Sequence, residues 1–185
     1  MFQQKLEAGD AENCRMEVIF LARDLRGICY ALSHNYSYSI FISWIQSKYL
    51  SMLIQCFKIY YDDAVVCSSL FRFFIEATTN RYQRLHFDVT SPNGIYLMKA
   101  ICSACVVYGS RAIGHTVSTD SSDYYVKKIK LTSYSLTLLN TALNSKYTNL
   151  ALFAVYNDSC LFDALLSNLN LVLSIDINFI IVSLE

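Results

Sequence analysis

Residues that interrupt α-helices are scarce in this sequence, which has one proline and five glycines among 185 residues. Because proline removes a backbone donor and glycine weakens helices, a chain with so few of them can form long uninterrupted helices. Apolar residues recur at helical spacing in six segments, which begin near residues 18, 50, 67, 95, 125 and 162. Two shorter candidates cover Ser37–Ser47 and Thr148–Tyr156. The sequence therefore predicts an all-α fold.

Each of the six segments keeps apolar residues on one side over three or more turns, so we expect that side to be buried. In the fifth segment these residues are Tyr125, Ile129, Leu136, Leu139 and Leu143. The last segment has the clearest pattern, at Phe162, Leu165, Leu166, Leu169, Val172 and Leu173. Further along, Ile175–Val182 mixes β-branched and polar residues, and the sequence leaves its secondary structure open.

Two helix starts are marked by specific residue types. Ser91 offers a capping hydroxyl ahead of Pro92, and proline is favoured at the first helical position. With Gly94, these residues are assigned a structural role in the turn that opens the fourth helix. Asp62 and Asp63 place negative charge at the start of the third helix, where the helix dipole favours it.

Six to eight helices with short linkers can form a closed bundle or a stack of helical hairpins. Successive hairpins begin about 30–45 residues apart, which is within the range of HEAT-type repeats. The repeats share little identity, so periodicity alone favours the stack only slightly. We expect an α-solenoid of HEAT-like antiparallel helix pairs with about three to four repeats. Residues 1–185 would form one unit, with residues 1–11 flexible.

Composition and charge exclude several classes of protein. Apolar types make up 54% of the chain and charged types 16%, so a disordered tail is excluded. The net charge is zero and no basic run exists, so we expect no nucleic-acid partner. Polar residues interrupt the long apolar stretches, so we expect no membrane insertion. Seven unpatterned cysteines, with no apolar signal-peptide core at the start, are typical of reduced thiols inside a cell.

No motif recommends an enzyme, a metal site or a cofactor. Cys102 and Cys105 match a CxxC pattern, but both fall in mid-helix on the apolar side, where cysteine is usually a small buried residue. His34, His86 and His115 are dispersed, without further ligands at suitable spacing. Phosphate-binding, nucleophile-elbow and metalloprotease motifs are absent from the sequence. An enzyme is the weakest hypothesis.

The first candidate binding cluster comprises Arg23, Asp24 and Arg26 in the first helix. At 100° per residue Arg23 falls opposite the apolar side, and the other two fall on its flanks. One interpretation is a solvated face with weak local ion pairs, and the residues alone favour it. The other is a basic lip on a protein-binding groove.

The second candidate cluster comprises Arg81, Gln83, Arg84 and Asp88, in the loop before the fourth helix. Loops on rigid scaffolds often carry function, and two guanidinium groups here could bind carboxylates. The alternative is that these residues shape the turn between two helices. The sequence does not decide between the two.

Two segments of the chain are unusual in composition, and they run from Leu21 to Gly27 and from Arg81 to Ile95. Three shorter motifs fall between and after them: Ser43-Trp44-Ile45, Tyr108-Gly109 and Val155-Tyr156-Asn157-Asp158. In sequence and in order, these segments resemble the exportin-7 family, a branch of the importin-β-like nuclear transport receptors. The resemblance covers roughly Val18 to Ile175, and residues 176–185 form a divergent tail that resembles a later family segment.

The resemblance implies an internal fragment of a right-handed superhelix of HEAT-like pairs. It also implies binding of protein cargo, of the small GTPase Ran in its GTP form and of nuclear pore proteins, with shuttling between cytoplasm and nucleus. A purely structural HEAT-type scaffold without a transport role is the alternative. Either role would use shape and charge along the helix faces and no covalent chemistry.

Overall fold

The computed structural model describes residues 11–85, 93–114, 122–144 and 159–182, and in these ranges every regular element is a helix. The α-helices are α2 (Ala11–Ala31), α3 (Asn35–Lys48), α4 (Leu50–Ile59), α5 (Ala64–Thr78), α6 (Asn93–Gly114), α7 (Ser122–Asn144) and α9 (Cys160–Val182). A short 3-10 helix, η1 (Arg81–Gln83), follows α5. The all-α prediction is confirmed, and Ile175–Val182 is part of α9.

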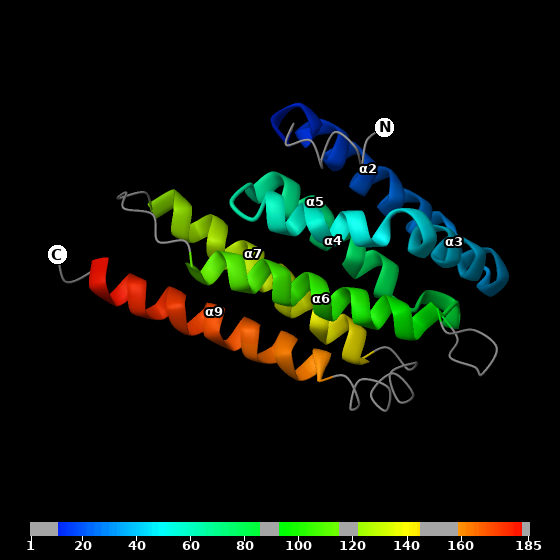
Figure 1. Ribbon diagram of the computed structural model, residues 1–185. Coiled ribbons are helices and arrows are strands. Elements are labelled where there is room, and N and C mark those ends of the chain that lie inside the picture. Colours follow the sequence, from blue (N-terminus) through cyan, green and yellow to red (C-terminus); the bar gives the residue numbers. More distant parts are fainter. Residues whose placement is uncertain (1–10, 86–92, 115–121, 145–158, 183–185) are drawn as a thin grey trace.

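The helices pack in two layers (Figure 1). In one layer α5 lies between α2 and α7, and in the other α6 lies between α4 and α9. Helix α3 contacts both α4 and α6, so it extends the second layer. This arrangement is compatible with a stack of HEAT-like helix pairs.

Asp63 caps the N-terminus of α5, as the sequence predicts. Its carboxylate accepts hydrogen bonds from the backbone N–H groups of Val65 and Val66, at 2.9 and 3.1 Å. These donors have no partner within the helix, so the side chain satisfies them. Ser91 and Pro92 lie outside the described residues, whereas Gly94 is buried in the first turn of α6. The predicted helix over Thr148–Tyr156 and residues 1–10 also lie outside them.

The core between the layers is rich in aromatic rings and thiols. Tyr108 of α6 meets Phe71 of α5 edge-on, with 5.1 Å between ring centroids, and Phe57 of α4 lies 4.6 Å from Phe71. The CxxC cysteines, Cys102 and Cys105, are both fully buried here. Burial raises the pKa of Cys105 to about 11, so its thiol stays protonated. The interpretation of this pair as small core residues is confirmed.

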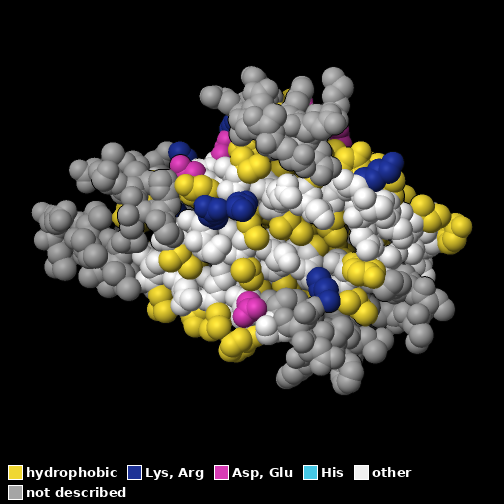
Figure 2. All heavy atoms as spheres, viewed as in Figure 1, with side chains coloured by type: hydrophobic (Ala, Val, Ile, Leu, Met, Phe, Trp, Pro, Cys, Tyr) yellow, Lys and Arg dark blue, Asp and Glu magenta, His cyan; other side chains and the backbone are white. Residues whose placement is uncertain are grey.

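The predicted buried side of α9 is wrong for most of its residues. Phe162, Leu165, Leu166, Leu169 and Leu173 are 40–62% exposed. The opposite side, with Ala164, Asn168 and Leu171, is buried. Figure 2 shows hydrophobic side chains along the lower edge, where α9 runs in the same view.

Close approach between α6 and α9 explains this choice of side. A Cβ atom placed at Gly109 would lie 2.0 Å from the Oγ atom of Ser167, so the two backbones meet where the side chains are smallest. In α7 the buried side likewise includes Thr132 and Ser135, while Ile129 and Leu136 are exposed. Apolar periodicity identifies the more hydrophobic side of a helix, but small side chains decide which side a neighbour can approach.

Candidate protein-binding groove

Arg84 lies beneath the surface, where it joins the C-terminal ends of two helices. Its side chain is 1% exposed. Nη1 donates to the carbonyl oxygens of Cys29 and Leu32 at the end of α2, the latter at 2.8 Å. Nη2 donates to the carbonyl oxygens of Glu76 and Thr79 at the end of α5, at 3.1 and 3.0 Å. Because the last carbonyls of a helix have no partner within it, one guanidinium caps both helices.

Further contacts hold the Arg84 guanidinium in place. Its carbon atom lies 4.1 Å from the centre of the Tyr38 ring, and Nη2 lies 3.5 Å from the Glu76 carboxylate. The Tyr38 hydroxyl donates to the carbonyl oxygen of Ala77 at 2.6 Å. A partner protein cannot reach this guanidinium without opening the fold. These bonds give Arg84 a structural role, the alternative that the sequence left open, and its contact with a partner stays a prediction.

The turn that places Arg84 has an unusual backbone. Tyr82 and Gln83 have φ angles of 54° and 53°, in the left-handed region that side-chain-bearing residues seldom adopt. Tyr82 is 82% exposed, so its ring contributes little to the core. Strain of this kind persists only where surrounding contacts fix it, and the bonds of Arg84 supply such contacts.

The first cluster, in contrast, faces solvent. Arg23, Asp24 and Arg26 are all exposed on α2. Arg23 and Arg26 line an open groove that crosses α2, α5 and α7, with a volume of about 1110 Å³. Arg81 lines the same groove, so the structure brings together residues from both predicted clusters. Gln83 is exposed on the neighbouring surface, and Asp88 lies outside the described residues.

Two aromatic residues hold arginines at the groove. The guanidinium of Arg81 lies 4.7 Å from the centre of the Tyr30 ring and pairs with the Glu76 carboxylate at 2.9 Å. The guanidinium of Arg72 lies 5.3 Å from the centre of the Tyr134 ring, and its Nη2 donates to the Tyr134 hydroxyl at 2.7 Å. Such contacts restrict two long side chains before any partner arrives.

Sequence reasoning missed Arg72, Tyr30 and Tyr134. Arg72 interrupts the apolar run Phe71-Arg72-Phe73-Phe74, and a single charge in such a run was the available signal. The two tyrosines carried no signal of their own because the chain contains 14 tyrosines. Their role depends on which helices become neighbours.

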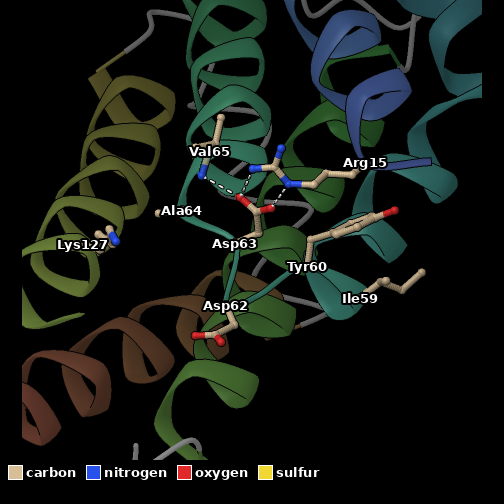
Figure 3. A pocket seen from close by; sticks show the side chains of 8 residues that line it. All are labelled: Arg15, Ile59, Tyr60, Asp62, Asp63, Ala64, Val65 and Lys127. Atoms are coloured by element: carbon tan, nitrogen blue, oxygen red, sulfur yellow. Dashed lines mark hydrogen bonds and ion pairs between the residues drawn. The ribbon is translucent and has the colours of Figure 1, made fainter. Parts of the chain in front are cut away.

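A second, smaller hollow, with a volume of about 520 Å³, lies at the start of α5 (Figure 3). The Arg15 guanidinium faces the Asp63 carboxylate, and Asp62 points away from this pair. Burial alone would raise the pKa of Asp63, but hydrogen bonds from Arg15 and from the backbone N–H groups of Val66 and Val65 outweigh it and lower the pKa. These bonds fix the helix start, so we assign this hollow to the fold.

Within the described residues, no group of three or more potential metal ligands comes together. His34 precedes α3 on the surface, and His86 and His115 lie outside the described ranges. In the same part of the chain, no helix is long and apolar enough to cross a membrane.

Comparison with known proteins confirms the resemblance to the exportin-7 family. The chain is 31% identical to exportin-7-B of Xenopus laevis over 164 residues, which is 89% of this chain and 15% of that protein. It is 32% identical to Ran-binding protein 17 of Mus musculus over the same shares. It is 33% identical to exportin-7 of Dictyostelium discoideum over 80% of this chain and 14% of that protein.

The chain thus spans about 15% of the length of these curated relatives. No protein-family model matches it. No solved structure matches it either. The relatives carry the names of an exportin and of Ran-binding proteins.

Proposed function

We propose that this chain, a relative of exportin-7 and of the Ran-binding proteins, is a segment of a nuclear transport receptor that binds protein cargo and the small GTPase Ran. Sequence identity of 31–33% over 80–89% of the chain carries this proposal. The alignment extends over 164 residues rather than one short motif. A receptor of this kind would act by binding alone, without catalysis or a cofactor.

The groove across α2, α5 and α7 is the surface that we assign to protein contact. Arg23, Arg26 and Arg81 line it, and Gln83 lies beside it. Charge distributed over the faces of neighbouring helices can select a partner and speed its association. In this role the receptor would shuttle between cytoplasm and nucleus and would contact nuclear pore proteins during passage.

A nucleotide-dependent pull-down tests the proposal. The full chain is immobilised and mixed with Ran locked in the GTP state or loaded with GDP, and bound Ran is quantified. We expect preferential capture of the GTP form. Equal capture of both forms, or capture of neither, would refute the claim that this segment recognises the nucleotide state of Ran.

A matched pair of charge reversals locates the contact. The double variant Arg23→Glu/Arg26→Glu alters the groove, whereas Lys48→Glu/Lys58→Glu makes the same change in charge at exposed positions of α3 and α4, in the other layer. We expect only the first variant to lose Ran or cargo. Equal loss in both would indicate a general charge effect with no localised surface.

A structural scaffold without a transport role is the second candidate. The observation that favours it is the buried Arg84, since a residue from the predicted binding loop serves the fold instead. If neither Ran form nor any cargo binds, while the purified chain is folded, the scaffold becomes the better account.

A further inference from the structure

We infer that the groove across α2, α5 and α7 binds an extended acidic peptide segment of a protein partner. The inference rests on the proposed protein-binding function and adds the chemistry of the partner. Arginine side chains from α2, α5 and η1 line one open depression, and one acidic residue, Glu76, lines it with them within the described part of the chain.

Charge is the first argument. Four arginines line the groove: Arg23, Arg26, Arg72 and Arg81. Glu76 is the only acidic residue among the described residues that line it, and its carboxylate already pairs with Arg81 and with the buried Arg84. Arg23 and Arg26 have no hydrogen-bond or ion-pair partner within the described part of the chain. The groove therefore offers an excess of positive charge to a ligand.

The type of cation is the second argument. A guanidinium presents a planar set of donors that matches the two oxygens of a carboxylate. Arg72 and Arg81 are already oriented, by Tyr134 and Tyr30 respectively, so binding restricts fewer rotamers. Tyr30 is 66% exposed, which leaves much of its side chain available to an apolar side chain of the same peptide.

The size of the groove is the third argument. Adjacent packed helices lie about 8–10 Å apart, so a groove that crosses three helices spans about 16–20 Å. An extended chain covers about 3.3 Å per residue, so about six residues would cross it. A single small anion would contact only one or two of the four arginines. A peptide with several carboxylates can contact all of them.

A protein partner fits better than a nucleic acid. The whole chain has no net charge, and exposed Asp24 lies on the same helix as Arg23 and Arg26. Nucleic-acid binding relies on a longer basic track that neutralises many phosphates. Here the arginines that lie close together occupy one short groove.

Fluorescence anisotropy with the full chain tests the inference. The probe is a labelled peptide of about six residues rich in Asp and Glu, compared with the same peptide carrying Asn and Gln. We expect the acidic peptide to bind at least about tenfold more tightly, with an affinity that falls as salt rises. Arg23→Glu/Arg26→Glu should weaken it by about tenfold or more, and Lys48→Glu/Lys58→Glu by less than about twofold.

Several results would overturn the inference. These are equal binding of the amide peptide, equal loss in the two charge-reversal variants, equally strong competition by inorganic phosphate at matched ionic strength, and tighter binding of a single-stranded oligonucleotide. Circular dichroism establishes that each variant is folded. If the double reversal unfolds the chain, Arg72→Gln at an exposed position replaces it and should still weaken the acidic peptide.

The outcome is separable from that of the Ran experiment. Acidic peptide binding without Ran or cargo binding would support the groove and remove the transport role. Ran binding that survives while the acidic peptide fails to bind would support the transport role and refute the groove chemistry.

Discussion

The contact between α2 and α5 and the contact between α6 and α9 are both extensive, but different kinds of side chain stabilise them. At the first, the side chain of Arg84 reaches under two helix ends and binds four carbonyl oxygens. At the second, Gly109 and Ser167 bring two backbones close together, and Leu171 of α9 is fully buried. The α2–α5 contact depends on hydrogen bonds from a buried guanidinium. The α6–α9 contact depends on small side chains and on apolar packing.

The helices of the two contacts also differ in the side chains that they expose to solvent. The outer side of α2 and α5 carries arginines and tyrosines that form the groove, whereas the outer side of α9 carries five large apolar residues. An extended apolar side of this kind usually contacts another surface. The same stack of helices therefore presents an arginine-lined groove across one layer and an apolar surface on α9 of the other layer.

The largest effect is expected at the polar contact. Arg84→Ala should lower the free energy of unfolding by about 3–5 kcal/mol, because four buried carbonyl oxygens lose their donor and the Glu76 carboxylate loses one of its two arginine partners. Urea denaturation measures this. Arg81→Ala is the matched control, since Arg81 also pairs with Glu76 but is partly exposed, and its loss should stay below about 1 kcal/mol. Similar losses in both variants would show that the buried contacts of Arg84 contribute no more to stability than the partly exposed contacts of Arg81.

A smaller loss is expected at the apolar contact. Leu171→Ala should cost about 2–4 kcal/mol, because it leaves a cavity at a fully buried position of α9. Leu169→Ala changes the same residue type on the exposed side, and its effect should be below about 0.5 kcal/mol. Thermal or urea unfolding measures the difference in stability between the two variants. If Leu169→Ala proved the more destabilising, α9 would be rotated relative to the described packing.

Removing the cap at the start of α5 should lower the free energy of unfolding by less than the two changes above. The size of this loss should depend on pH. Asp63→Ala should cost about 1–2 kcal/mol at neutral pH, because it removes the helix cap and the Arg15 pair. Since folding lowers the pKa of Asp63, its contribution is present above the ordinary value of 3.8 and is lost as pH falls through the lower folded pKa. Unfolding curves of wild type and variant should converge at acid pH. A difference that persists there would exclude this carboxylate as the cause.

The smallest change in stability is expected on the outer side of α9. Leu166→Lys/Leu169→Lys should alter the free energy of unfolding by less than about 0.5 kcal/mol, since both side chains are exposed. Self-association should nevertheless fall, because isolated repeat stacks with exposed apolar ends tend to aggregate. Light scattering at several protein concentrations measures this. A wild-type chain that stays monomeric at all of them would contradict the expectation.

Local patterns predicted the elements of this fold better than their packing. The apolar spacing correctly identified helices in the described ranges, apart from the state of Ile175–Val182, which it left open. The Asp63 cap could be predicted because capping depends on a few neighbouring residues. The buried side of α9 could not be predicted, because it depends on Gly109 of a helix that is distant in sequence. In the same way, Arg23, Arg26 and Arg81 could be named as candidates, but only the packing of α2 on α5 separates Arg81 from the buried Arg84.

The buried cysteines have a practical consequence. Six thiols in the described residues are buried, distributed over α2, α4, α5 and α6. Burial raises the pKa of Cys29 and of Cys56 to about 12, so these groups hold their protons and resist alkylation while the helices stay packed. Each thiol would become reactive only when its own helix separates from its neighbours. Pulse alkylation followed by mass spectrometry could therefore follow how this stack opens, helix by helix, without any introduced label.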